Sequence, residues 1–161
     1  MTLVLAFRDV GTPDLARRGL TPASAPPAVL LLDVEADLSV DDDGRTVWSE
    51  PAFPVAELAR ELALRLRLPA EERTDFAFDS MTYDVPGAVR IAATGDGWRV
   101  GSVFAPDAWS SPCPWPVPAR ALTAFTDSVR TRVAALGADP HLVPAAARPA
   151  TAASANGTPC R

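Results

Sequence analysis

Lysine is absent from this chain of 161 residues, and histidine and cysteine are rare, with one histidine and two cysteines. The 15 basic residues are therefore all arginine, which we attribute to GC-rich coding because alanine and proline are also abundant. Two cysteines are too few for a disulfide framework. His141 has no second histidine and no cluster of acids or cysteines beside it. We therefore expect no metal site, no cofactor and no catalytic triad.

The motifs that mark common enzyme classes are absent as well. There is no P-loop, no G-x-S-x-G, no H-E-x-x-H and no pair of C-x-x-C motifs. The glycines of Gly95–Gly101 fit a hairpin turn and not a dinucleotide-binding loop, which would open a helix. The sequence therefore favours a protein that is not an enzyme.

Long apolar runs and positive net charge are also lacking. No stretch approaches the about 20 apolar residues that span a membrane, and Met1–Val10 lacks the pattern of a signal peptide. The formal net charge is −5, which opposes binding to nucleic-acid phosphates. These features predict a cytoplasmic protein that contacts neither membrane nor nucleic acid, and whose protein partner, if it has one, is basic.

The clearest pattern that is present is the alternation of apolar and acidic residues in Val29–Val40. Side chains alternate across a β-strand, so this pattern predicts one strand with an apolar face toward the core and an acidic face toward water. The apolar face would consist of Leu30, Leu32, Val34, Ala36, Leu38 and Val40. The other face would carry Asp33, Glu35, Asp37 and Ser39.

Two hairpins, two further strands and two helices complete the predicted fold. Asp41–Gly44 would turn the first strand into Arg45–Ser49, and Gly95–Gly97 would join strands Val89–Thr94 and Trp98–Phe104. The further predicted strands are Thr2–Arg8 and Phe76–Tyr83, and the predicted helices are 54–67 and 119–136. We therefore predict an α+β fold, in which an antiparallel sheet of five or six strands packs two amphipathic helices on one face.

The remaining segments are rich in proline and alanine. Residues 105–118 contain five prolines and are expected to form no regular element. Within them, Trp109 and Trp115 are expected to cap the core, with anchoring of a partner as the alternative. Residues 138–161 carry almost no large apolar side chain and are expected to be a flexible tail that follows a single domain, 1–137.

The acids of the first hairpin are the main candidates for a binding site. Residues 33–50 hold seven acids and one arginine, and such a surface attracts a basic partner by charge complementarity. The candidate partner-binding residues are Asp33, Glu35, Asp37, Asp41, Asp42 and Asp43. The same acids fit two other interpretations, an outer face that only solubilises the sheet and a catalytic carboxylate pair.

A calcium loop is a further interpretation of this hairpin. Ser39, Asp41, Asp43, Gly44 and Glu50 have the spacing of EF-hand ligands and of its central glycine. However, the first ligand position is serine, and the flanking residues alternate with the period of a strand. We therefore interpret the segment as a hairpin turn.

Two alternatives to protein binding stay open. One is a small-molecule binder or enzyme whose pocket lies between the sheet and the helices and is lined by tryptophans, and convergence of Glu50, Tyr83 or Asp79 in it would favour this alternative. The other is a domain that acts only through oligomerisation.

The middle of the chain resembles a known group of proteins. Val47–Ala59, Asp75–Met81 and Gly95–Phe104 are similar to segments of small, uncharacterised actinobacterial single-domain proteins, and the resemblance covers roughly residues 29 to 136. Domains of this style also occur among the immunity proteins of polymorphic toxin systems. The resemblance implies a family of unknown function with this fold. Together with the acidic hairpin and the missing catalytic motifs, it favours a non-enzymatic, immunity-like role in protein binding. It carries over no catalytic or binding residue.

Overall fold

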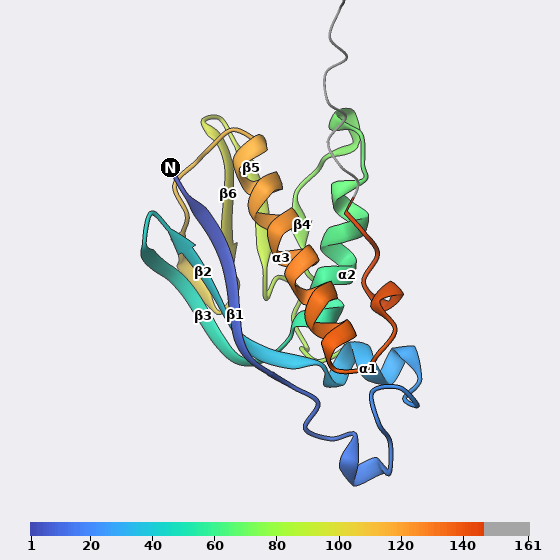
Figure 1. Ribbon diagram of the computed structural model, residues 1–161. Coiled ribbons are helices and arrows are strands. Elements are labelled where there is room, and N and C mark those ends of the chain that lie inside the picture. The colour runs from blue at the N-terminus through green and yellow to red at the C-terminus, as the bar shows by residue number, and fades with distance from the viewer. Residues whose placement is uncertain (147–161) are drawn as a thin grey trace, which may run out of the picture.

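The structure, a computed structural model, describes residues 1–146 and shows an α+β fold with two antiparallel sheets (Figure 1). The three-stranded sheet has the order β1-β2-β3 and consists of β1 (Leu3–Gly11), β2 (Glu35–Asp42) and β3 (Arg45–Pro54). The four-stranded sheet has the order β4-β5-β6-β7 and consists of β4 (Phe76–Ala77), β5 (Arg90–Thr94), β6 (Gly97–Ser102) and β7 (Ala105–Trp109). The α+β class is therefore confirmed, and the prediction of one sheet of five or six strands is wrong.

Three α-helices and three short 3₁₀ turns accompany the sheets. The helices are α1 (Pro27–Asp33), α2 (Val55–Leu66) and α3 (Pro116–Ala135), and the 3₁₀ turns are η1 (Ala16–Arg18), η2 (Ala70–Glu72) and η3 (Pro140–Leu142). Both predicted helices are present, and α3 begins three residues earlier than expected. Among the described residues, no helix combines the length and the apolar character that crossing a membrane requires.

The predicted strand Val29–Val40 is half wrong. Val29–Asp33 belongs to α1, which starts at Pro27, where proline suits the first helical turn because its missing N–H has no helical partner there. From Glu35 onward the segment is β2, and the predicted apolar residues Ala36, Leu38 and Val40 are buried. The hairpin with β3 is confirmed by the pairing of Asp42 with Arg45 across the turn.

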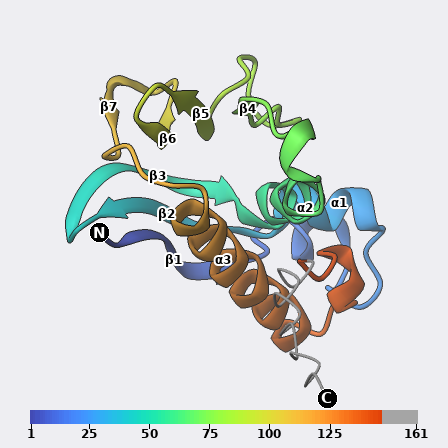
Figure 2. The ribbon, with the colours of Figure 1, turned by 90° about the horizontal axis from the view of Figure 1, so that it is seen from above.

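The four-stranded sheet lies beyond β3, which is an edge strand of the three-stranded sheet. In Figure 2, α3 and β1 lie on one side of the molecule, and β5, β6 and β7 lie beyond β3 on the other. The two sheets are linked near the β2–β3 turn, where the backbone N–H of Ser111 donates to Oδ2 of Asp42 at 2.7 Å. Helix α3 contacts α2, β1 and β6, so it holds both sheets to the helical layer.

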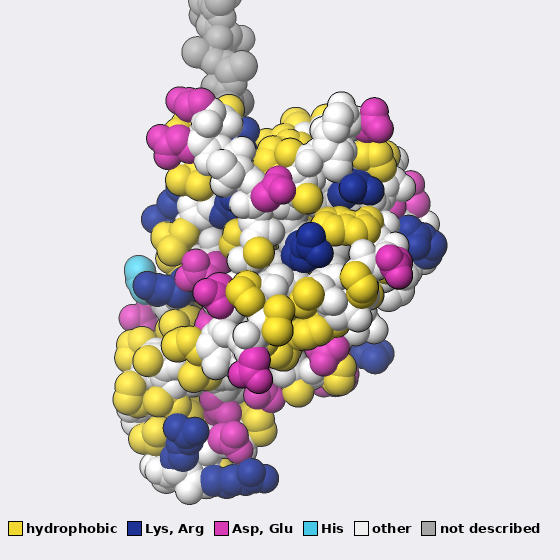
Figure 3. Space-filling view, turned by 180° about the vertical axis from the view of Figure 1, so that it is seen from behind, with side chains coloured by type: hydrophobic (Ala, Val, Ile, Leu, Met, Phe, Trp, Pro, Cys, Tyr) yellow, Lys and Arg dark blue, Asp and Glu magenta, His cyan; other side chains and the backbone are white. Residues whose placement is uncertain are grey.

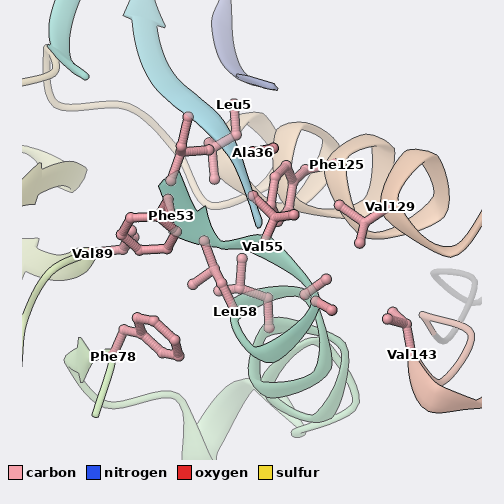
Figure 4. Close-up of a cluster of buried hydrophobic side chains, with 14 of the residues drawn as sticks. Leu5, Ala36, Phe53, Val55, Leu58, Phe78, Val89, Phe125, Val129 and Val143 are labelled. Carbon is pink, nitrogen blue, oxygen red and sulfur yellow. The ribbon is translucent and has the colours of Figure 1, made fainter. Parts of the chain in front are cut away.

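The core fills the space between the helices and the sheets (Figure 4). Phe53 is its centre, with ring centroids 5.7 Å from Trp48, 5.8 Å from Phe78 and 5.6 Å from Tyr83. The apolar face of α2 points into this core, since Val55, Leu58, Ala59 and Leu62 are fully buried and Leu66 is partly buried.

Three other segments differ from the prediction. Only Phe76 and Ala77 of the predicted strand Phe76–Tyr83 pair with a neighbour. Residues 105–118, expected to be irregular, contain β7 and the start of α3. The beginning of the expected tail is packed, because Ala138, Leu142 and Val143 are buried. Residues 147–161 of that expected tail lie outside the described residues.

Candidate functional site

The outer face of the three-stranded sheet, opposite the helices, carries most of its polar side chains. The buried residues of β1 and β2 alternate with residues that face outward. On this face Arg8 pairs with Asp37 across the β1–β2 ladder, and Val4 pairs with Asp41. Strand β3 adds Ser49 opposite Ser39 and Thr46 opposite Asp41.

Two of the six predicted binding acids do not lie on the surface. Asp33 is 6% exposed, and its two carboxylate oxygens accept hydrogen bonds from the backbone N–H groups of Asp14 and Leu15, each at 3.0 Å. Asp42 is 5% exposed and accepts from Ser111, as described above. The expectation that both acids face water is wrong, because Asp33 is the last residue of α1 and Asp42 continues the buried side of β2 beyond Val40.

Asp41 and Asp43 reach solvent but are engaged in the hairpin itself. Asp41 accepts from the hydroxyl of Ser39 at 2.8 Å and from that of Thr46 at 2.6 Å. Asp43, with φ of +48° in the turn, accepts from the backbone N–H of Thr2 at 2.6 Å and lies 3.8 Å from the N-terminal amino group. The residues with calcium-loop spacing thus form the β2–β3 hairpin.

Asp37 occupies the most irregular part of the sheet. The register shifts between Arg8 and Gly11 on β1, and it shifts again on β3 opposite Ala36–Leu38. Within the β3 bulge, the backbone N–H of Ala52 donates to Oδ1 of Asp37 at 3.3 Å, and Ala52 has a φ of +49°. Bulges and left-handed non-glycine residues bend a strand and concentrate next to binding sites. Asp37 is therefore both a brace for the bulge and an exposed charge, with 39% of its side chain accessible.

Three adjoining surface depressions follow these irregularities. The first, about 400 Å³, includes Asp37 and Glu50 in its lining. The second, about 350 Å³, shares Asp37 with the first, and the third, about 320 Å³, shares Glu35 with the second. We call this series the acidic trough and define it by Glu35, Asp37 and Glu50. Two basic residues, Arg8 and Arg18, also line it.

Nearby acids affect Glu35, and two acids of the trough, Glu35 and Glu50, affect Tyr83. Burial, followed by the charges of Asp33 and Asp14, raises the pKa of Glu35 above its ordinary value. Burial is also the main cause that raises the pKa of Tyr83 to about 12, and Glu50, Glu35 and Glu57 add to it. Glu50 thus contributes to the raised pKa of Tyr83, whereas Asp79 is exposed and is not among the causes.

Glu57 is a buried acid that sequence reasoning missed. It is 5% exposed on α2 and accepts from the hydroxyl of Ser80 at 2.7 Å and from the backbone N–H of Met81 at 3.0 Å. Its position in the first turn of a helix is common for an exposed glutamate, so only the partner loop, Ser80–Met81, could have indicated burial. The space between sheet and helices, where the alternative interpretation would place a pocket, is filled by Phe53, Phe78 and other buried side chains of the core.

Tyr83 offers a direct test of this electrostatic environment, because it is the only tyrosine in the chain. We expect the ultraviolet absorbance of tyrosinate to show a midpoint at about 12 in the folded protein and an ordinary midpoint, near 10.0, in urea. Between these values the unfolded chain loses its phenolic proton first, so the free energy of unfolding falls as the pH rises. Glu50→Gln should shift the folded midpoint downward. A folded midpoint equal to the unfolded one would contradict the proximity of these acids.

Comparison with protein families and known proteins gives one match. The model of a family described as a domain of unknown function, DUF7878, matches residues 21–135, so the chain belongs to that family. The expected membership in a family of unknown function is thereby confirmed, whereas the actinobacterial origin and the immunity-like style stay predictions. No curated protein and no solved structure matches the chain.

Proposed function

We propose that this member of the DUF7878 family is a non-enzymatic protein-binding domain whose acidic trough receives an extended basic segment of a partner protein. The observation that carries the proposal is the row of adjoining depressions, in which neighbours share Asp37 and then Glu35. A row of shallow depressions that extends from the sheet to α1 suits a chain segment better than a compact small molecule.

The charges of the trough support a basic occupant. Within residues 1–146, Glu35 and Glu50 form no ion pair. Asp37 has only Arg8 at 3.7 Å, and the Arg8 side chain is 80% exposed. Such surface pairs contribute little free energy, so an incoming lysine or arginine can displace Arg8 at small cost. A bound cation would also offset the repulsion that Glu35 experiences from Asp33 and Asp14.

Neutralising the three trough acids is expected to weaken binding of a basic peptide. The variant is Asp37→Asn, Glu35→Gln and Glu50→Gln; asparagine keeps an oxygen that can accept from Ala52, so the bulge is preserved. The probe is a short fluorescent peptide of alternating lysine and threonine, followed by anisotropy at low and high salt. We expect about tenfold weaker binding, because three exposed ion pairs of roughly 0.5 kcal/mol each together account for about a factor of ten in affinity.

The matched control removes three negative charges elsewhere, by Glu71→Gln, Glu72→Gln and Asp96→Asn, all at exposed positions. It should bind the peptide as the unmodified protein does. Equal binding by the trough variant and this control, or no binding by the unmodified protein, would contradict the proposal. A natural partner captured from the native lysate should show the same difference between the two variants.

A further inference from the structure

The outer face of the four-stranded sheet carries an arginine–tryptophan patch, which we define by Arg90, Arg99 and Trp109. Arg90 pairs with Gly101 across β5 and β6, and Gly101 pairs with Trp109 across β6 and β7. Arg99 precedes Gly101 by two residues on β6, so it projects to the same face. The three side chains therefore converge over one glycine.

Gly101 allows the indole ring to lie close to the strand. A Cβ atom at this position would come within 2.8 Å of the Trp109 ring, so any larger residue would displace the ring. The indole N–H donates to the carbonyl of Pro106 at 3.0 Å, which fixes the orientation of the ring. Trp109 thus forms a rigid platform on the sheet. The expectation that it caps the core is wrong, because it is not among the side chains packed against the core.

Both arginines stack over this platform. The guanidinium carbon of Arg90 lies 4.8 Å from the ring centroid of Trp109, and that of Arg99 lies 5.2 Å from it. Neither arginine takes part in any ion pair within residues 1–146, and Arg99 Nε is buried without a hydrogen-bond partner there. Figure 3, which views the molecule from behind, shows arginine side chains on either side of a hydrophobic patch.

Two positive charges on one aromatic surface repel each other, and a bound anion would remove this repulsion. The stacking holds each guanidinium in place, so little side-chain freedom is lost when an anion binds. Arg45 extends the positive surface, because its Nη2 lies 3.4 Å from the carbonyl oxygen of Trp109. The patch therefore has the properties of a preorganised site for carboxylates.

We propose that the arginine–tryptophan patch binds an acidic segment of a protein through the carboxylates of its aspartates or glutamates. A nucleic acid fits less well, because the guanidinium groups already lie over the ring on which a base would stack. The net charge of −5 also opposes a polyphosphate chain. This inference goes beyond the acidic trough, since it assigns a second surface, on the other sheet, to a partner of opposite charge.

The test compares a short fluorescent polyglutamate peptide with single-stranded oligothymidine and with inorganic phosphate. The variant is Arg90→Gln with Arg99→Gln, and the control is Arg120→Gln with Arg130→Gln on α3, which changes the net charge equally. We expect salt-sensitive binding of polyglutamate that is at least about fivefold weaker in the variant and unchanged in the control. The trough variant should bind polyglutamate at least as well as the unmodified protein, which separates this proposal from the first.

The proposal would be overturned by no binding of polyglutamate, by equal binding by variant and control, or by tighter binding of oligothymidine that is lost in the variant. Displacement of the peptide by phosphate at equal concentration would also overturn it, because the site would then recognise a small anion. Should the glutamine variant not fold, Arg90→Lys with Arg99→Lys keeps the charges and loses the planar guanidinium groups that stack on Trp109. Undiminished binding by that lysine variant would reject the role of the stacked guanidinium groups.

Discussion

Replacing Phe53 by alanine is expected to lower the free energy of unfolding by about 3–5 kcal/mol, the range found when a buried aromatic residue is truncated. Phe53 is fully buried, and its ring contacts those of Trp48, Phe78 and Tyr83. Trp48 and Phe53 belong to β3, and Phe78 and Tyr83 lie in the chain between β4 and β5. The substitution would therefore leave a cavity between the three-stranded sheet and a segment of the four-stranded one. Close-packed surroundings of this kind cannot collapse fully around a smaller side chain.

Urea denaturation of the variant measures this loss, and Leu64→Ala is the matched control. Leu64 lies on α2 and is 42% exposed, so its truncation should cost less than about 1 kcal/mol. A cost for Phe53→Ala no greater than that for Leu64→Ala would mean that the junction of the two sheets is not packed as described.

The second large effect is expected from Asp33→Ala, which should destabilise the protein by about 2–4 kcal/mol. The substitution removes the acceptor of two backbone N–H groups, those of Asp14 and Leu15. Leu15 is 2% exposed, so its N–H would be left in the interior without a partner. An unsatisfied buried donor costs roughly 1–3 kcal/mol, and the loop that joins β1 to α1 would lose its anchor.

Asparagine at position 33 should give an intermediate loss, because it keeps one acceptor oxygen and presents an N–H₂ group to the second donor. Asp79→Ala, at an exposed position, should leave the free energy of unfolding within about 0.5 kcal/mol of the original. Hydrogen exchange of the Asp14 and Leu15 amides adds a local measurement. Unchanged protection of these two amides in Asp33→Ala would show that the carboxylate does not hold them.

The sequence predicted those elements whose evidence is local and unambiguous. The β2–β3 turn has an Asp-Gly signal, and α2 has one clear apolar face, so both were found within one or two residues. Leu30–Leu32 was the main error, because a short apolar run fits a buried helix as well as a strand. The prolines at 26 and 27 were the signal for the helix, since proline favours the first helical turn.

The number of sheets could not be read from the same patterns. Each hairpin is encoded by its own turn, but whether two hairpins join edge to edge depends on contacts between distant residues. Here the register of β3 is interrupted at Pro51–Ala52, and Asp42 is used to bind Ser111 instead of facing water. Pro106 also led to the prediction of an irregular segment at β7, although proline is tolerated on an edge strand such as this one.

The candidate sites were predictable only in part. The exposure of Glu35, Asp37 and Asp41 followed from simple alternation, whereas the trough depends on two bulges that no local signal marks. The arginine–tryptophan patch depends on the pairing of Arg90, Gly101 and Trp109, which belong to three strands. Cross-strand register of this kind becomes known only when the sheet is assembled.

The place of α3 in the chain has a consequence for synthesis on the ribosome. Every strand pairs with a neighbour that directly precedes or follows it in sequence, so both sheets can form as the nascent chain emerges. The ring of Phe7 on β1, however, meets that of Phe125 on α3, 5.7 Å away, only after most of the chain has been made. Until then the apolar side of the first strand has no cover, and it is the surface that a chaperone would encounter.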